Sequence, residues 1–289
     1  MDLVRASHLY KVFGKNERQV IERLKAGESR EELASLGTAA VIDVSFEVAK
    51  GETFDVMGLS GSGKSTLIRM INGLWSPSEG TVEVAGKVVS DMNDAQLRAL
   101  RRDHVSMVFQ HFALLPHLTV RENAAYGLKL QGKLKQKERL EKANEWLNTV
   151  GLNGWGDKYP HQLSGGMQQR VGLARALAAE TDILLMDEAF SALDPLIRRE
   201  MQDQLLELQG ALNKTIIFIT HDLNEAMYLG DHIAVMRNGR VAQIGTSDEI
   251  LTQPADDYVA DFVQDVDRSR VLTASAVMRP TEAVVSRSA

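Results

Sequence analysis

The chain has 289 residues, no cysteine, 44% hydrophobic residues and a formal net charge of −6. This length suffices for one large domain or two smaller ones. The lack of cysteine excludes disulfides, thiolate metal sites and cysteine nucleophiles, and the acidic balance argues against bulk nucleic-acid binding. Because the sequence shows neither an apolar run of about 18 residues nor a signal-peptide pattern, we expect a cytoplasmic protein. A peripheral place on a membrane complex remains open.

The first 40 residues hold a strand followed by an interruption. Residues 3–13 are predicted to form an edge strand that ends near two aromatic residues, Tyr10 and Phe13. Residues 15–40 break the strand pattern with one helically spaced apolar run and then an S-x-x-E capping pattern that begins at Ser29. We therefore predict an insertion of two short helices, which is either a surface decoration or a regulatory or partner-contacting hairpin.

The remaining chain alternates short apolar runs with helical patterns. Strands are predicted at 41–48, 53–57, 81–84, 87–89, 105–109, 183–186, 215–220, 233–236 and 241–244. Helices are predicted at 67–73, 94–102, 123–150, 167–180, 197–212, 224–229 and 246–263. This order predicts an α/β fold with a parallel sheet and an antiparallel β portion near the start.

Residues 58–65 fit the phosphate-binding loop G-x-x-x-x-G-K-[ST], between a predicted strand and a predicted helix. Its glycines allow the backbone N–H groups to turn toward an anion, and the positive end of the next helix adds to this field. Lys64 would place its charge on the β- and γ-phosphates, and Ser65 would offer a hydroxyl to Mg²⁺. Asp55 is the misfit, because a carboxylate in a buried strand is costly unless it is paired. The loop residues predicted to bind nucleotide are Gly58, Ser60, Gly61, Gly63, Lys64, Ser65 and Thr66.

An apolar run at 183–186 ends in two carboxylates, Asp187 and Glu188. Alone, this pattern is at least as typical of a capped buried strand as of a ligand-binding site. With a phosphate loop upstream, the carboxyl end of a parallel strand is where a ligand is expected. Asp187 is then predicted to hold Mg²⁺, directly or through water, and Glu188 to act as the general base toward the attacking water.

The segment LSGGMQQ, at 163–169, has the form of a second anion site. Ser164 would cap a helix, Gly165 and Gly166 would expose backbone amides, and the helix dipole would face a phosphate. Taken alone, the segment could equally be an ordinary capped helix.

The three motifs together resemble the ATP-binding-cassette (ABC) ATPases, a family of phosphate-loop NTPases, in which LSGGMQQ is the signature sequence. The resemblance implies one ATPase domain over residues 1–264, with a parallel-sheet core, an antiparallel β subdomain and a helical subdomain at about 111–178. It also implies a head-to-tail homodimer with two ATP molecules between the chains. In it, Ser164, Gly165, Gly166 and Gln168 would grip the γ-phosphate of ATP bound to the other chain.

Further site residues follow from the resemblance. Phe13 would stack on adenine, with Tyr10 as the second candidate. Gln110 would touch Mg²⁺ and the attacking water and link the site to a membrane partner. The S-A-L-D loop ending at Asp194 would cross the dimer interface, and His221 would contact the γ-phosphate. The catalytic candidates are thus Glu188, His221 and Gln110, and the metal candidates are Ser65, Gln110 and Asp187.

A narrower resemblance is to the ATPase subunits of glycine betaine/proline (quaternary amine) importers. It is carried by HLYKVFG, the insertion, VSMVFQHFALLPHLTVRENAAYGL and MDEAFSALDPLIRREMQDQL, in which Ala189 stands where many cassette ATPases have proline. The implied function is ATP hydrolysis that drives import of a quaternary amine osmolyte through a permease at the cytoplasmic face of the membrane. An extracytoplasmic solute-binding protein would take part indirectly. The alternatives are an importer for another solute, such as a polar amino acid, and a soluble non-transport ABC ATPase.

Two further expectations concern surfaces beyond the site. The apolar stretch after Gln110 either receives a short helix of the permease or is plain core; its members are Phe112, Leu114, Leu115 and His117. Residues 271–280, VLTASAVMRP, look like the opening of a cystathionine-β-synthase-type (CBS) regulatory module. Residues 265–289 are therefore expected to be a tail or the truncated start of such a module.

Overall fold

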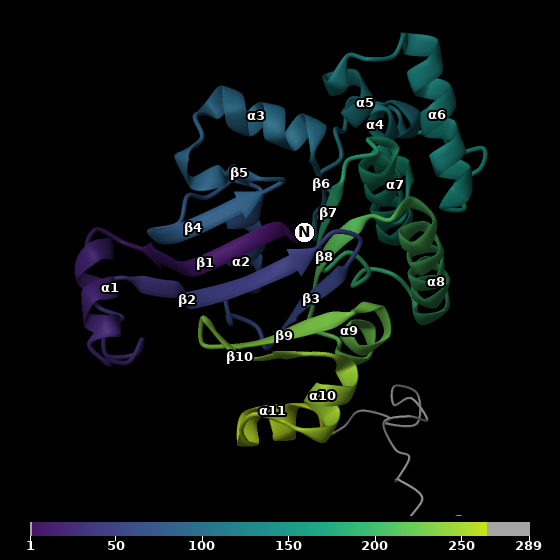
Figure 1. Ribbon diagram of the computed structural model, residues 1–289. Coiled ribbons are helices and arrows are strands. Elements are labelled where there is room, and N and C mark those ends of the chain that lie inside the picture. The colour runs from purple at the N-terminus through teal and green to yellow at the C-terminus, as the bar shows by residue number, and fades with distance from the viewer. Residues whose placement is uncertain (1, 265–289) are drawn as a thin grey trace, which may run out of the picture.

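A six-stranded sheet forms the centre of the protein in a computed structural model that describes residues 2–264 (Figure 1). The strand order is β10-β9-β3-β8-β7-β6, in which β10 is antiparallel to β9 and the other neighbours are parallel. The strands are β3 (Thr53–Met57), β6 (Val105–Val108), β7 (Ile183–Asp187), β8 (Thr215–Thr220), β9 (His232–Arg237) and β10 (Arg240–Gly245). Strands β3, β7 and β8 are buried along their whole length, as their continuous apolar runs predict. The predicted parallel sheet is confirmed.

A second, four-stranded antiparallel sheet packs above the first, in the order β2-β1-β4-β5. Its strands are β1 (Asp2–Phe13), β2 (Thr38–Ala49), β4 (Glu79–Val84) and β5 (Lys87–Val88). The prediction of an edge strand at the start of the chain is wrong, because β1 lies between β2 and β4, and Val4 pairs with both Val48 and Val84. Side-chain alternation reports the two faces of a strand, whereas edge position depends on backbone partners far along the chain.

Helices cover both faces of the large sheet, and the first helix of the chain packs against the antiparallel sheet instead. They are α1 (Glu17–Lys25), α2 (Lys64–Ile71), α3 (Asp94–Asp103), α4 (Val120–Ala124), α5 (Tyr126–Gln131), α6 (Gln136–Thr149), α7 (Gly165–Ala178), α8 (Pro195–Leu212), α9 (Leu223–Leu229), α10 (Ser247–Thr252) and α11 (Asp257–Phe262). One hydrophobic core lies between the two sheets around α2, and a second joins β7 and β8 to α4, α6, α7 and α8. Within residues 2–264, no helix has both the length and the apolar character needed to cross a membrane.

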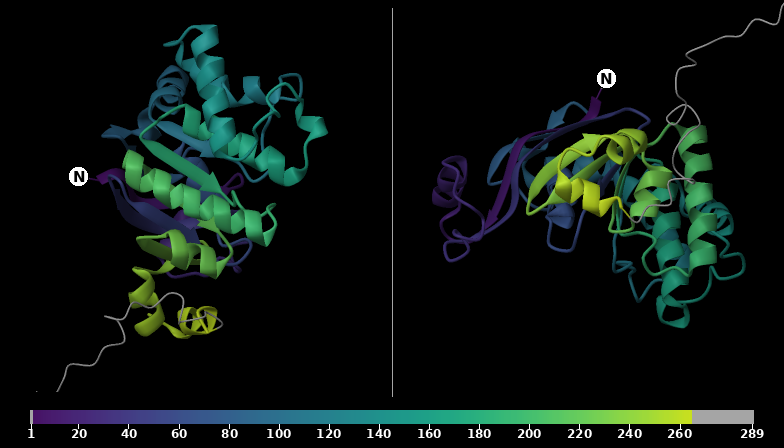
Figure 2. Two further views of the ribbon diagram at one scale, coloured as in Figure 1. Left: turned by 90° about the vertical axis from the view of Figure 1, so that its right-hand side faces the viewer. Right: turned by 90° about the horizontal axis from the view of Figure 1, so that it is seen from below.

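Two helices predicted as continuous are divided. The pattern at 123–150 belongs to α4, α5 and α6, because the Glu138 carboxylate accepts a hydrogen bond of 2.7 Å from the N–H of Lys135 and starts a new helix there. The pattern at 246–263 belongs to α10 and α11, which are separated at Pro254. Helices α4 to α7 gather at one end of the molecule, and α1 lies at the other (Figure 2). The tail predicted at 265–289 lies outside the described residues.

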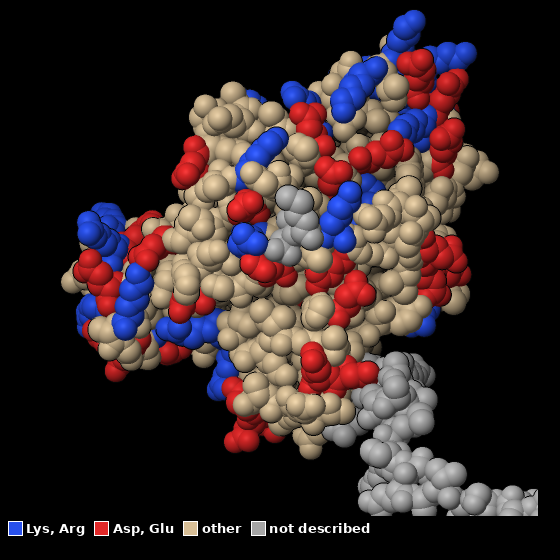
Figure 3. Space-filling view, in the orientation of Figure 1, with Lys and Arg blue, Asp and Glu red and all other residues tan. Residues whose placement is uncertain are grey.

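The insertion contains one helix, not the two predicted. Helix α1 forms, but residues 30–36 make only turns. Ser29 and Glu32 do exchange capping hydrogen bonds, of 2.8 Å from the Ser29 N–H and 3.3 Å from the Glu32 N–H. Capping hydrogen bonds alone do not ensure that a short segment becomes a helix, because nucleation is costly. The insertion instead packs a small core of its own against β1 and β2, and its outer surface is densely charged (Figure 3).

Asp55 sits in the middle of β3 with its side chain fully buried. Both carboxylate oxygens lack a hydrogen-bond partner, and Gly230 lies so close that a β-carbon there would be 2.7 Å from Oδ2. Burial raises the pKa of this carboxyl well above its ordinary value, and the nearby charges of Glu225 and Asp231 raise it further. Burial without a partner thus favours the protonated form of this side chain, at the cost of an unsatisfied polar group.

Replacing this carboxyl should stabilise the protein. Above the ordinary aspartate pKa of about 4, the unfolded chain releases a proton that native Asp55 retains, so stability falls by about 1.4 kcal/mol per pH unit until the raised native pKa is reached. We expect Asp55→Val to raise the free energy of unfolding by about 1–3 kcal/mol at neutral pH and to flatten this pH dependence. Urea denaturation between pH 4 and pH 8 measures both. Asp55→Asn is the control, which should lose the pH slope but gain less stability, since its amide stays unsatisfied. Equal stability and an unchanged slope in Asp55→Val would contradict the assignment.

Candidate nucleotide-binding and catalytic site

The loop between β3 and α2 is fitted closely to its neighbours. Gly58 has φ 147° and Gly63 has φ 106°, conformations that side-chain-bearing residues rarely adopt. A β-carbon at Gly58 would lie 2.3 Å from the carbonyl O of Met236, and one at Gly63 would lie 2.3 Å from that of Ala40. Only glycine therefore allows the loop to pass between the ends of β9 and β2 and begin α2 in this orientation.

Lys64 folds back into this loop. Its Nζ donates to the carbonyl O of Gly58 over 2.7 Å and to that of Leu59 over 3.1 Å. Burial lowers the pKa of the Lys64 ammonium, while the carboxylates of Glu188 and Asp187 act in the opposite direction. At the loop tip, Leu59, Ser60 and Gly61 are exposed, whereas Thr66 on α2 is half-buried. A cation on an N–H-rich loop at a helix start suits a polyphosphate.

Ser65 and Asp187 bring two oxygen donors together. The Ser65 hydroxyl donates to Oδ1 of Asp187 over 3.0 Å, and Asp187 is 1% exposed. Burial raises the pKa of Asp187, opposed by the Ser65 hydrogen bond and by Arg69, whose Nη2 lies 3.9 Å from Oδ2. A hydroxyl and one carboxylate fit Mg²⁺, which takes its other ligands from water and phosphate. No group of three or more His, Cys, Asp or Glu side chains in residues 2–264 is arranged to hold a metal alone.

Glu188 receives two polar side chains on one carboxylate oxygen. Gln110 Nε2 donates to its Oε2 over 2.9 Å, and His221 Nδ1 lies 3.3 Å from the same atom. The three residues follow β6, β7 and β8, so neighbouring parallel strands deliver them to one edge of the sheet. Glu188 has φ 49° and its N–H donates to the carbonyl O of Ile219 over 2.9 Å, which fixes the backbone in a strained conformation. A carboxylate oriented in this way can accept a proton from water.

The two aromatic candidates for the adenine contact differ in exposure. The Phe13 ring is 38% exposed and packs edge-on against Trp75 at 5.0 Å, whereas Tyr10 is 4% exposed and belongs to the insertion core. Arg69 stacks on Trp75, 4.9 Å from the ring centroid, and also approaches Asp187. Lys11 Nζ lies over the Phe13 ring, 5.3 Å from its centroid, but the residue stays more exposed than Tyr10, which favours Phe13 for the adenine contact. Sequence reasoning missed Trp75, because no motif marks an aromatic residue at that position.

The structure leaves the signature residues apart from the phosphate loop. Ser164 caps α7, accepting a 3.3 Å hydrogen bond from the Met167 N–H, and Gln168 donates to the Leu163 carbonyl O. Asp194 caps α8. None of the hydrogen bonds described in residues 2–264 joins these residues to the loop. The residues that converge in one chain are Lys64, Ser65, Gln110, Asp187, Glu188 and His221; those that do not are Ser164, Gly165, Gly166, Gln168 and Asp194.

Comparisons with known proteins identify a matching family and several similar sequences. The "ABC transporter" family model matches residues 41–191. The glycine betaine transport ATP-binding protein OpuAA of Bacillus subtilis is 54% identical over 97% of this chain and 68% of its own length. The glycine betaine/proline betaine transport system ATP-binding protein ProV of Escherichia coli is 52% identical over 95% of this chain and 69% of its own length.

A solved structure agrees with the fold. The dimeric ATP-binding cassette MJ0796, in a post-hydrolysis state bound to ADP and Pi, superimposes with a TM-score of 0.74 at 32% identity, covering 84% of this chain and 98% of that one. The predicted ABC-type fold, with its parallel core and antiparallel β subdomain, is thereby confirmed. The chain belongs to the ABC transporter family, as one of its ATP-binding subunits.

Proposed function

We propose that this chain is the ATP-hydrolysing subunit of an importer for a quaternary amine osmolyte, and that it works on a membrane permease at the cytoplasmic face. The reaction is supported by Glu188, which Gln110 and His221 orient beside the Ser65–Asp187 pair. The solute class is supported by relatives more than half identical over nearly the whole chain, whose names specify glycine betaine or proline betaine.

In the proposed reaction, each group has one task. The phosphate loop and Lys64 bind the β- and γ-phosphates, and Phe13 stacks on the adenine. Ser65 and Asp187 would hold Mg²⁺, which would neutralise charge on the phosphates when bound. Glu188 takes a proton from the attacking water as the water adds to the γ-phosphorus and the bond to ADP breaks. Gln110 and His221 keep the Glu188 carboxylate in place for this transfer.

The site is completed by a second copy of the chain. Ser164, Gly165 and Gly166 at the start of α7, with Gln168, would contact the γ-phosphate bound by the partner, and Asp194 would lie near the shared interface. The dimeric form of the 32% identical cassette supports this arrangement. ATP then favours the closed dimer, because the signature residues gain a phosphate partner only on closure, and hydrolysis removes that partner.

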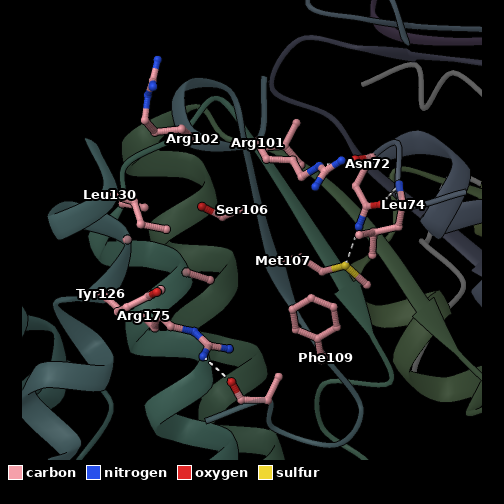
Figure 4. A pocket seen from close by; sticks show the side chains of 15 residues that line it. Asn72, Leu74, Arg101, Arg102, Ser106, Met107, Phe109, Tyr126, Leu130 and Arg175 are labelled. Carbon is pink, nitrogen blue, oxygen red and sulfur yellow. Dashed lines mark hydrogen bonds between the residues drawn. The ribbon is translucent and has the colours of Figure 1, made fainter. Parts of the chain in front are cut away.

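The permease is proposed to dock in a cavity of about 250 Å³ between the sheet and the helical subdomain (Figure 4). Its walls include Phe109 and Tyr126, and two exposed leucines, Leu74 and Leu130, stand at its rim. We call this cavity the docking groove. The segment after Gln110 contributes Ala113 to it, while Leu114, one of the residues predicted for docking, packs partly into the core. An apolar groove of this size suits the side chains of a short helix.

Solute-stimulated ATPase activity tests the proposal. The chain would be assembled with its permease and solute-binding protein in proteoliposomes, and ATP hydrolysis measured with glycine betaine, proline betaine, choline or a polar amino acid. We expect a quaternary amine to stimulate hydrolysis several-fold, because the solute-loaded complex favours the closed state of the ATPase dimer. Stimulation by a polar amino acid alone would support the alternative importer. Failure of the chain to associate with any permease would favour a non-transport ATPase.

A further inference from the structure

Arg175, near the end of α7, binds the segment that follows Gln110. Its Nη1 donates to the carbonyl O of Ala113 over 2.7 Å, and its Nη2 donates to that of Phe112 over 3.1 Å. Figure 4 shows the guanidinium reaching from α7 along the docking groove to this segment. One side chain thus holds two consecutive backbone carbonyls, and both Arg175 and Ala113 line the groove.

The segment needs such a restraint. Phe112 has φ 54° and Ala113 has φ 49°, so two successive residues with β-carbons occupy the left-handed region. That region is unfavourable for such residues, and two in a row persist only where the surroundings hold them. The hydrogen bonds from Arg175 hold the carbonyls of both residues.

Holding these two carbonyls has a cost for Arg175. Burial lowers the pKa of the Arg175 guanidinium, so the charged form pays for its desolvation. Its hydrogen bonds in the described part of the chain go to the two carbonyls and not to a carboxylate. A half-buried cation without a counter-ion costs some stability, whereas its planar fork of donors suits two fixed acceptors. What Arg175 provides is a fixed backbone conformation at Phe112 and Ala113.

The same segment lies along α7 as far as the signature. The Phe112 carbonyl O is 3.6 Å from where a β-carbon would stand at Gly172, and the tip of its ring is 3.6 Å from that position at Gly165. Gln110, two residues earlier, reaches Glu188. The segment therefore touches the docking groove and the signature residue Gly165, and the residue just before it, Gln110, touches the catalytic carboxylate.

We propose that Arg175 is a positioning residue that fixes residues 111–113 on α7, so that Gln110 and the signature move together when the docking groove is occupied. The inference rests on the proposed function, because it takes Gln110 as catalytic and the groove as the permease site. Arg175 acts through Gln110 and touches no substrate itself.

A double-mutant cycle tests this coupling. Arg175→Met, Gln110→Ala and the double variant would be assembled with the permease, and kcat and KM for ATP measured. We expect each single change to lower kcat about 10- to 100-fold, with KM for ATP within about threefold, because displacement of a positioned group impairs the chemical step and spares the phosphate loop. The double variant should equal Gln110→Ala, since residues acting in one unit are non-additive. Arg175→Lys keeps the charge but not the planar fork of donors, so its kcat should lie between those of Arg175→Met and the parent chain. This variant preserves the test if Arg175→Met does not fold.

Arg170 provides a matched control on the same helix. Its Nη1 donates to the carbonyl O of Val150 over 3.3 Å, away from the segment. Arg170→Met should leave kcat within about threefold and combine additively with Gln110→Ala. If Gln110→Ala is impaired, an unchanged kcat in both Arg175 variants would overturn this inference and leave the proposed function standing. Additivity in the cycle would do the same. A silent Gln110→Ala would overturn the proposed role of Gln110 and the coupling with it.

Discussion

Glu188→Gln should abolish most turnover and leave ATP binding intact. The amide has nearly the shape of the carboxylate but cannot accept the proton of the attacking water, so we expect kcat to fall about 10²- to 10⁴-fold. The groups proposed to bind phosphate, Lys64 and Ser65, keep their contacts with Gly58 and Asp187. The Kd for ATP should therefore change by less than about threefold. Single-turnover hydrolysis and fluorescent-nucleotide titration separate the two quantities, and gel filtration with ATP should show an accumulated dimer.

Asp187→Asn is the companion variant, because it removes the other carboxylate of the same strand end. It should weaken Mg²⁺-dependent ATP binding, since Asp187 and Ser65 are the proposed metal donors. Opposite signatures in two adjacent residues, one on turnover and one on binding, would be hard to produce by general damage to β7. Hydrolysis by Glu188→Gln within a few-fold of the parent chain would rule out the base assignment.

The parts of this site that could be predicted from the sequence are those that one local segment encodes. The phosphate loop, the two carboxylates after β7 and His221 after β8 each combine a strand pattern with the residue that follows it. Parallel strands end at one edge of a sheet, so local patterns suffice to bring such residues together. The hairpin at Asn238 and Gly239 was predictable for a similar reason, because its turn residues adopt positive φ there.

Features that depend on distant partners could not be predicted. The interior place of β1 and the loss of the second insertion helix are set by contacts with segments far along the chain. Arg175 illustrates the same limit at the site, because the sequence marks it only as an ordinary basic residue of a helix. Its role becomes visible only when the structure places it beside Phe112 and Ala113. Asp55 differs, because the sequence already marked it as anomalous and the structure supplies the missing fact that it is unpaired.

A negative charge at Ser164 should prevent ATP-dependent dimerisation. Ser164 caps α7 and points its hydroxyl to the N–H of Met167, so Ser164→Asp preserves the cap while placing an anion beside the partner's γ-phosphate. Two like charges about 4 Å apart near a protein surface repel by about 4 kcal/mol at an effective dielectric constant of about 20. This repulsion weakens the dimer about 10³-fold for each of its two ATP sites. Ser164→Asn is the matched control, since it also caps the helix but carries no charge, and its dimer should weaken far less.

The experiment is best done in the Glu188→Gln background, where ATP is not consumed. Light scattering after gel filtration measures the amount of dimer, and nucleotide titration of the monomer measures its affinity for ATP. Both Ser164 variants should leave this affinity unchanged, because a monomer binds ATP through its own phosphate loop, whereas Ser164 would contact the ATP of the partner. A Ser164→Asp variant that dimerises with ATP as tightly as Ser164→Asn would exclude the composite site. Loss of ATP binding by the monomer would show instead that Ser164 acts on its own chain. Only weakened dimerisation with intact binding in the Asp variant supports a phosphate shared between two chains.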